Sequence, residues 1–172
     1  MKSISLTIVF LVGAIHFDYG QVKDASQHLK SQADKMGQAF TTGDYKTFAR
    51  YTYPLIVRSM GGTDKMAGVL EKGANDLKAQ GMSFGAIRFD EPSAVIRNER
   101  ELQATIAQHT EIKLRQGRLV NTSTLIAVSA DNGHNWTFID TSNKDLETLR
   151  KAMPNLSKAL ILSPPQPPVR YN

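Results

Sequence analysis

The spacing of apolar residues changes once along this chain, near residue 81. Before that point, apolar residues recur at three- and four-residue steps, which is the period of an amphipathic helix. After it, apolar and polar residues alternate within short segments bounded by turn residues, which is typical of strands with one buried face. Helices followed by a run of strands predict an α+β fold, and 172 residues suffice for a single domain.

Two amphipathic helices are expected before Pro54. The first covers residues 22–40 and ends near Gly43, because glycine is a common C-terminal cap. The second covers residues 45–53, with Asp44 as its N-cap, and Pro54 closes it because proline lacks an amide donor. The apolar stripe of the first helix consists of Val22, Ala25, Leu29, Ala33, Met36 and Phe40.

The next segment is expected to hold a strand and a third helix. Residues 54–62, "PLIVRSMGG", predict a short β-branched strand that ends in a glycine turn. Thr63 is the expected N-cap of the third helix, which Gly81 ends. The apolar residues of this helix are Met66, Val69, Leu70 and Leu77.

Antiparallel strands are predicted for the rest of the domain. They cover residues 82–90, 93–98, 102–115, 119–129 and 135–140, with turns between them. In the third of these strands, Leu102, Ala104, Ile106, Ile112 and Leu114 share the buried parity, whereas Gln103, Thr105, His109, Glu111, Lys113 and Arg115 share the other.

Gln108 and Thr110 are polar residues within the apolar parity of that strand. A buried polar side chain is costly unless it finds a partner or a water molecule. Either both side chains point into a wet cavity, or a β-bulge near residues 107–109 shifts the parity and sends them to solvent.

Residues 129–136, "SADNGHNW", have the spacing Ser-x-Asp-x-Gly-x-x-Trp and resemble the Asp-box of sialidases and related β-propellers. A propeller requires several blades of about 40–50 residues each, and the chain contains no second copy of the box. The box lies between two predicted strands. It is therefore interpreted as the tip of a β-hairpin, where Gly133 supplies a positive φ and the Asx side chains bond the local backbone.

The order helix, helix, strand, helix and then antiparallel strands resembles the nuclear transport factor 2-like superfamily, also called cystatin-like or ketosteroid-isomerase-like. The resemblance rests on residues 40–54, "FTTGDYKTFARYTYP", on Gly61 and Gly62, and on the hairpin of residues 125–140. The chain is similar in particular to small exported members from Bacteroidetes-type bacteria. This resemblance implies a strongly curved sheet wrapped around the helices as a cone, whose open end often forms a ligand pocket.

Enzymes of that superfamily use a pocket acid as a base, and dehydratase relatives use a His-Asp pair. Asp140 shares a strand face with Trp136 and Phe138, and is the candidate acid, with His109 as its candidate partner. The alternative is that Asp140 caps the following helix and that His109 is exposed on the polar side of its strand.

A ligand pocket in the cone is expected to involve Tyr45, Tyr53, Gln108, Thr110 and Trp136. The alternative for the aromatic residues is ordinary core packing. The four histidines show no metal-ligand spacing, so neither a metal nor a cofactor is predicted.

Three classes of function remain: an exported domain that binds a small molecule or acts as an accessory, a small isomerase- or dehydratase-type enzyme using Asp140, and a module that dimerises through the convex sheet face. Nucleic-acid binding is not expected. The net charge is +5, but the 21 basic residues are scattered among 16 acids, with no basic run interleaved with aromatic residues.

Both ends of the chain carry recognisable segments. Lys2 precedes an apolar run at residues 4–15, too short for a membrane span and typical of a signal peptide, so residues 1–20 predict export to the periplasm or the medium of a bacterium. An uncleaved anchor is the alternative. The domain then covers residues 21–162, including a C-terminal helical extension, and residues 163–172 form a proline-rich tail that is expected to be disordered. The extension's apolar residues are Leu146, Leu149, Met153 and Leu156.

Overall fold

The structure, a computed structural model, describes residues 19–142 and 144–172, so the predicted signal peptide lies almost entirely outside the described residues. No helix in these two ranges is long and apolar enough to cross a membrane. The elements are, in chain order, α1 (Tyr19–Thr41), α2 (Tyr45–Tyr51), α3 (Pro54–Ser59), α4 (Thr63–Ala79), β1 (Ser83–Phe89), β2 (Ile96–Asn98), β3 (Glu101–Lys113), β4 (Arg118–Ser129), β5 (Thr137–Asp140), α5 (Leu146–Ala152) and β6 (Val169–Tyr171).

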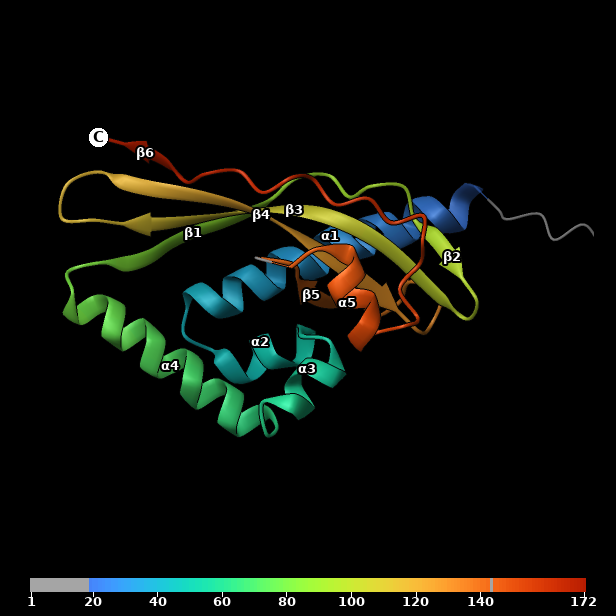
Figure 1. Ribbon diagram of the computed structural model, residues 1–172, viewed down its shortest axis with the longest axis horizontal. Coiled ribbons are helices and arrows are strands. Elements are labelled where there is room, and N and C mark those ends of the chain that lie inside the picture. Colours follow the sequence, from blue (N-terminus) through green and yellow to red (C-terminus); the bar gives the residue numbers. More distant parts are fainter. Residues whose placement is uncertain (1–18, 143) are drawn as a thin grey trace, which may run out of the picture.

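The fold is α+β, with the helices α1–α4 before an open antiparallel sheet of six strands. The sheet order is β1-β3-β4-β5, while β2 pairs with β3 and β6 pairs with β4. Strands β3 and β4 pair without interruption, from Leu102 opposite Ser129 to Lys113 opposite Arg118. Figure 1 shows these two strands running along the length of the molecule, with α2 and α4 on one side of the sheet. The predicted α+β class is confirmed.

The first face of the sheet packs against α1. The predicted apolar stripe of α1 is confirmed for the residues from Ala25 to Met36, which are buried. Phe48 and Tyr51 of α2 pack against the same cluster, so two helices cover this face. The buried members of the cluster are Ala25, Leu29, Ala33, Met36, Phe89, Leu102, Ala104, Ile106, Leu125, Ala127, Trp136 and Phe138.

The second face of the sheet is covered at one end by α5 and the residues that follow it. Leu149, Met153, Leu156 and Leu160 are buried there against Ile126, Val128 and Ile139 of the sheet. Asp145 is the N-cap of α5, because its carboxylate accepts a hydrogen bond from the Thr148 amide at 2.7 Å. The helix ends at Ala152, just before Met153 and Pro154.

Gln103 contradicts the simple alternation predicted for β3. It was placed on the polar side of the strand, yet its side chain is completely buried. Its amide donates to the Asn155 carbonyl at 2.8 Å, and its amide oxygen accepts from the Ser157 backbone at 2.8 Å. Burial is tolerated because the segment after α5 supplies these partners, which lie about 50 residues further along the chain.

The strand predicted for residues 54–62 is wrong, because residues Pro54–Ser59 form the short helix α3. Proline is favourable in the first turn of a helix, where its missing amide would have no partner in any case. Gly61 and Gly62 follow with φ of 88° and 96°, and they turn the chain into α4. Gly62 occupies the N-cap position of α4 that was expected for Thr63.

The helix predicted for α4 is confirmed, but one residue that was expected to lie in its buried stripe is exposed. Met66 is buried, whereas the Val69 side chain is 58% exposed and therefore lies outside the core. Gly81 has a φ of 78° just after the helix, as a C-terminal glycine should.

The bulge considered near residues 107–109 is absent from the β3–β4 pairing, which is continuous through this region. The irregularity lies instead in β1, between Phe84 and Ile87, where β1 pairs with β3. Gln108 and Thr110 therefore keep the parity of the first face, and both are half-buried.

The tail is only partly free of pairing. Residues 164–168 lie outside any strand, in keeping with their prolines, but Val169–Tyr171 form β6 on the edge of β4, contrary to the expected disorder. The Arg118 guanidinium lies over the Tyr171 ring, 5.1 Å from its centroid. Gly117, with a φ of 76°, lets the tail approach the β3–β4 turn, because a Cβ there would clash with the Tyr171 carbonyl.

Candidate functional site

The tip of the β4–β5 hairpin is closed by its own side chains. The Ser129 hydroxyl donates to Asp131 Oδ1 at 2.8 Å and accepts from the Gly133 amide at 2.9 Å. Asp131 also accepts from the Asn135 backbone at 2.8 Å and from its side chain at 2.7 Å. Asn132 and Gly133 have φ of 60° and 90°. The interpretation of this segment as a hairpin turn is confirmed.

The protonation of Asp131 follows from these contacts. Burial raises the pKa of the carboxyl, but the hydrogen bonds from Asn135 and Ser129 outweigh it, and the pKa is lowered overall from its ordinary value. All three of these hydrogen bonds come from residues of the same turn, so the Asp131 carboxylate stabilises that turn.

The same hairpin is fastened to α1. The Trp136 indole donates to the Gly133 carbonyl at 3.0 Å, and its side chain is only 1% exposed. Gln32 of α1 accepts from the Trp136 amide at 2.9 Å and donates to the His134 carbonyl at 2.7 Å. Trp136, proposed from the sequence as a pocket residue, is thus part of the core between the hairpin and α1.

Asp140 lies at the end of β5, on the first face, opposite Leu125. Its side chain is exposed and accepts from the Ser142 amide at 2.8 Å and from the Ser142 hydroxyl at 2.6 Å. The capping role considered for Asp140 is wrong, since Asp145 caps α5, and Asp140 instead closes a local turn.

His109 lies on the second face of the sheet, opposite Thr122. Its Nε2 is 2.9 Å from Asp90 Oδ1, and its Nδ1 is 3.0 Å from the Thr122 hydroxyl. The structure therefore does not bring His109 and Asp140 together, because the sheet separates them.

The two tyrosines considered for the pocket lie in different surroundings. Tyr45 is half-buried and meets the Phe40 ring edge-on, with 5.6 Å between ring centroids. Burial, with a smaller contribution from Glu71, raises its pKa. Tyr53 packs against the second-face cluster, and its hydroxyl accepts from Asn155 at 3.2 Å.

A set of four polar residues does converge on the first face. Gln108 and Thr110 of β3 lie opposite Ser123 and Asn121 of β4, and we call these four residues the polar strip. All four are half-buried, and Gln108 donates to the Thr110 hydroxyl at 3.1 Å. Within the described parts of the chain, the side chains of Asn121 and Ser123 bond no other residue.

Apolar residues border the polar strip on both sides along the strands. Ile106 lies opposite Leu125 at one end, and Ile112 lies opposite Leu119 at the other. Two of the four strip residues, Gln108 and Thr110, were expected from the sequence, whereas Asn121 and Ser123 were not. The signal was present, because these two residues interrupt the apolar parity of residues 119–127 just as Gln108 and Thr110 interrupt that of β3.

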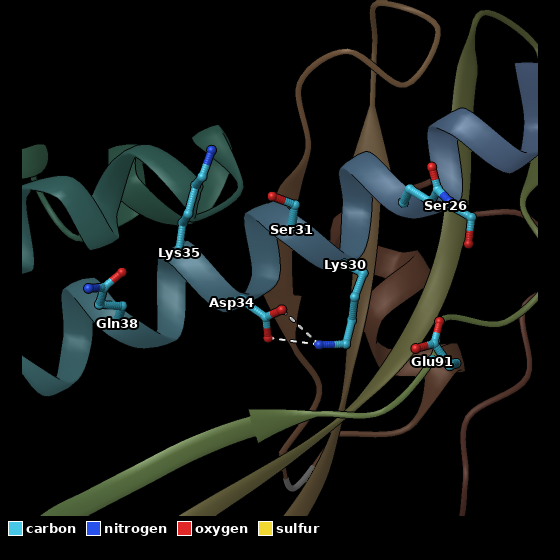
Figure 2. Close-up of a pocket in the computed structure, with 8 residues that line it drawn as sticks. Ser26, Lys30, Ser31, Asp34, Lys35, Gln38 and Glu91 are labelled. Carbon is cyan, nitrogen blue, oxygen red and sulfur yellow. Dashed lines mark hydrogen bonds and ion pairs between the residues drawn. The ribbon is translucent and has the colours of Figure 1, made fainter.

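A surface groove of about 710 Å³ runs along the exposed side of α1, and none of the pocket residues predicted from the sequence lines it. Figure 2 shows its α1 side chains and Glu91, which comes from the loop after β1. Lys30 and Asp34, which both line it, pair at 2.8 Å, so the groove carries both signs of charge. Its lining consists of Ser26, Gln27, Lys30, Ser31, Asp34, Lys35, Gln38 and Glu91.

No family model matches this chain, and no curated protein matches its sequence. Among the described residues, no group of three or more His, Asp or Glu side chains is arranged to hold a metal ion. The case for a function therefore depends on the geometry of the chain itself.

Proposed function

We propose that this protein is an exported domain of the nuclear transport factor 2-like type that binds a small molecule on the polar strip. The fold part of the proposal is supported by the order of elements, with helices before an antiparallel sheet. The helices α1 and α2 pack on the face that carries the strip, which is where a cone-shaped fold would hold its ligand. The segment after β5 would then be an addition to that fold.

The observation that carries the proposal is the change from apolar to polar residues in the middle of a single sheet face. A core face has no need of four adjacent amides and hydroxyls, since each costs free energy unless it is bonded. A ligand site, in contrast, combines an apolar lining with a few convergent polar groups. The polar strip has this composition, with apolar pairs at both ends.

The chemistry of the strip indicates the class of ligand. Its four side chains are two amides and two hydroxyls, which carry no formal charge and can both donate and accept hydrogen bonds. The matching ligand is a neutral, amphipathic small molecule with hydroxyl, carbonyl or amide groups on an apolar body.

Substitution of the strip tests this proposal. A library of neutral amphipathic compounds is screened by thermal shift against the wild type, Gln108→Leu, Asn121→Leu and Thr105→Val. Thr105 is the matched control, because it is a half-buried β3 residue on the opposite face, across from Ile126. Compounds that stabilise the wild type and Thr105→Val should lose at least about tenfold in affinity in the strip variants, the equivalent of one or two hydrogen bonds.

Compounds that bind all four proteins equally would contradict a site on the strip. Mass spectrometry of small molecules that co-purify with the wild type, but not with Asn121→Leu, would identify the natural ligand. Export has its own test, because N-terminal sequencing of the native protein should find a chain that begins near Gln21. A cytosolic chain that still begins with Met1 would contradict export.

A further inference from the structure

Two histidines that are far apart in the sequence lie side by side on the surface. His28 belongs to α1, and His134 lies at the tip of the β4–β5 hairpin. Their ring centroids are 6.3 Å apart, and the ring planes are inclined by 40°. Both residues are exposed, so neither is held in place as part of the core.

The hydrogen bonding of His28 leaves one ring nitrogen free. Its Nδ1 lies 3.3 Å from the Gly133 carbonyl oxygen, and a carbonyl can only accept, so Nδ1 carries the proton. In the neutral ring, Nε2 then has an unshared lone pair. Histidines that bind metals commonly donate their other N–H to a backbone carbonyl in this way, which fixes the tautomer and the ring orientation.

The His134 ring is equally accessible. Within the described ranges, its imidazole hydrogen-bonds no other residue, so either nitrogen is free to act as a ligand. The carboxylate of Asp131 is close enough to His134 for the two to interact electrostatically. A negative charge beside the ring favours a bound cation.

The backbone beneath the two rings is firmly fixed. Gln32 bonds both the His134 carbonyl and the Trp136 amide, at 2.7 and 2.9 Å. Gly133 lies so close to Ala25 that a Cβ on the glycine would be 2.6 Å from the Ala25 Cβ. The helix and the hairpin tip therefore present the two rings on a rigid base, and a site that is already organised binds more tightly than a flexible one.

We propose that His28 and His134 form a binding site for a divalent transition-metal ion of the Zn²⁺ and Cu²⁺ class. Imidazole nitrogen is a preferred ligand of these ions, at about 2.0–2.1 Å for Zn²⁺. Because no hydrogen bond to a described residue holds the exposed His134 ring, a change of its rotamer can direct one of its nitrogens to the ion bound by Nε2 of His28. Two protein ligands leave the remaining positions to water, because in the described part of the chain no group of three His, Asp or Glu side chains is placed to hold one ion.

Calorimetry with ZnCl₂ on the untagged exported chain tests the proposal. His28→Asn is the informative variant, because the Asn amide can replace Nδ1 as the donor to Gly133 while Nε2 is lost. His134→Ala removes the other ligand. His109→Ala is the matched control, since His109 is half-buried on the second face and is already paired with Asp90 and Thr122.

The wild type and His109→Ala should bind one Zn²⁺ per chain with the same affinity. His28→Asn and His134→Ala should each bind at least about tenfold more weakly, since even changes in the surroundings of a metal ligand cost about 10–100-fold. The urea unfolding midpoint of His28→Asn should match that of the wild type, which separates loss of a ligand from loss of structure. With Cu²⁺, electron paramagnetic resonance should detect two nitrogen ligands in the wild type and one in each site variant.

Zn²⁺ affinity that is unchanged in both site variants would overturn the proposal. So would a wild type that does not bind Zn²⁺, or a loss of affinity of the same size in His109→Ala.

Discussion

Each face of the sheet carries one buried cluster, and the two clusters are built by different means. The buried cluster of the first face packs against α1 and α2 mainly through apolar side chains, from Ala25 to Phe138 along the chain. The second face combines apolar contacts from α5 with a buried polar network around Gln103, Asn155 and Ser157. The first cluster therefore derives its stability mainly from apolar area removed from water, whereas the second also depends on the hydrogen bonds of the buried Gln103 side chain.

This difference decides which substitutions each face tolerates. An apolar core accepts changes of shape at a cost that grows with the cavity left behind. Replacement of a buried amide lowers stability whenever it leaves the partners of that amide without hydrogen bonds, even when the side-chain volume is conserved. The following experiments measure that contrast, from the largest expected effect to the smallest.

Trp136→Ala removes the largest fully buried side chain of the first face. The free energy of unfolding should fall by about 3–5 kcal/mol, because burial is lost and a cavity remains. Urea unfolding followed by circular dichroism measures this change. Val69→Ala, at a site that is 58% exposed, is the control and should shift the free energy by less than about 0.5 kcal/mol. Equal effects of the two substitutions would contradict the position of Trp136 in the core.

Gln103→Leu conserves size on the second face and removes its polar network. The free energy of unfolding should fall by about 2–3 kcal/mol, chiefly because the buried Ser157 amide loses its acceptor. Gln108→Leu is the control on the first face, where the side chain is only half-buried and bonds Thr110 alone. If Gln108→Leu is the more damaging of the two, the contrast between the faces is wrong.

Asp131→Ala tests the turn at the hairpin tip, which packs against α1. At neutral pH it should cost about 1 kcal/mol, the scale of one local hydrogen bond. The folded state lowers the pKa of Asp131, so its contribution is present above the unfolded pKa of about 3.9 and is lost as the pH falls through the lower folded value. Urea unfolding at a series of pH values should therefore show that the free energies of unfolding of the wild type and Asp131→Ala converge below about pH 4. A difference that stays constant down to low pH would exclude the carboxylate as its cause.

Deletion of residues 169–172 should have the smallest effect. The strand β6 pairs with only Arg118–Val120, and its Val169 and Tyr171 side chains are 52% and 46% exposed. The melting temperature should change by less than about 2 °C in differential scanning calorimetry, since little apolar area is lost. A larger decrease would mean that β6 contributes to stability through its pairing with β4.

The parts of the fold that follow from local periodicity were predictable. The stripe on α1, the Asp44 cap and the hairpin around Gly133 all depend on contacts within a few residues. The burial of Gln103 was not predictable, because its partners at residues 155–157 are remote in the sequence and have no pattern that links them to β3.

Two other errors have equally physical causes. Residues 54–59 are rich in β-branched side chains, but a leading proline and two following glycines favour a short helix, which the neighbouring helices then hold in place. Asp140 and Asp145 both precede α5, and only the helix boundary decides which of them is the cap. The polar strip was half predictable, since parity within β3 showed two of its members, whereas the register with β4 was needed to add Asn121 and Ser123.

The cover of the second face has a consequence for the order of folding. Every contributor to the first-face cluster precedes residue 139, so that cluster can form as soon as the hairpin is complete. Ile126, Val128 and Ile139 are covered only once residues 146–160, which are synthesised later, have packed on them. During synthesis, the apolar side chains of the second face therefore have no cover until residues 146–160 have been made. When the segment after β5 packs on the sheet, it removes the apolar surface on which two incomplete chains would associate.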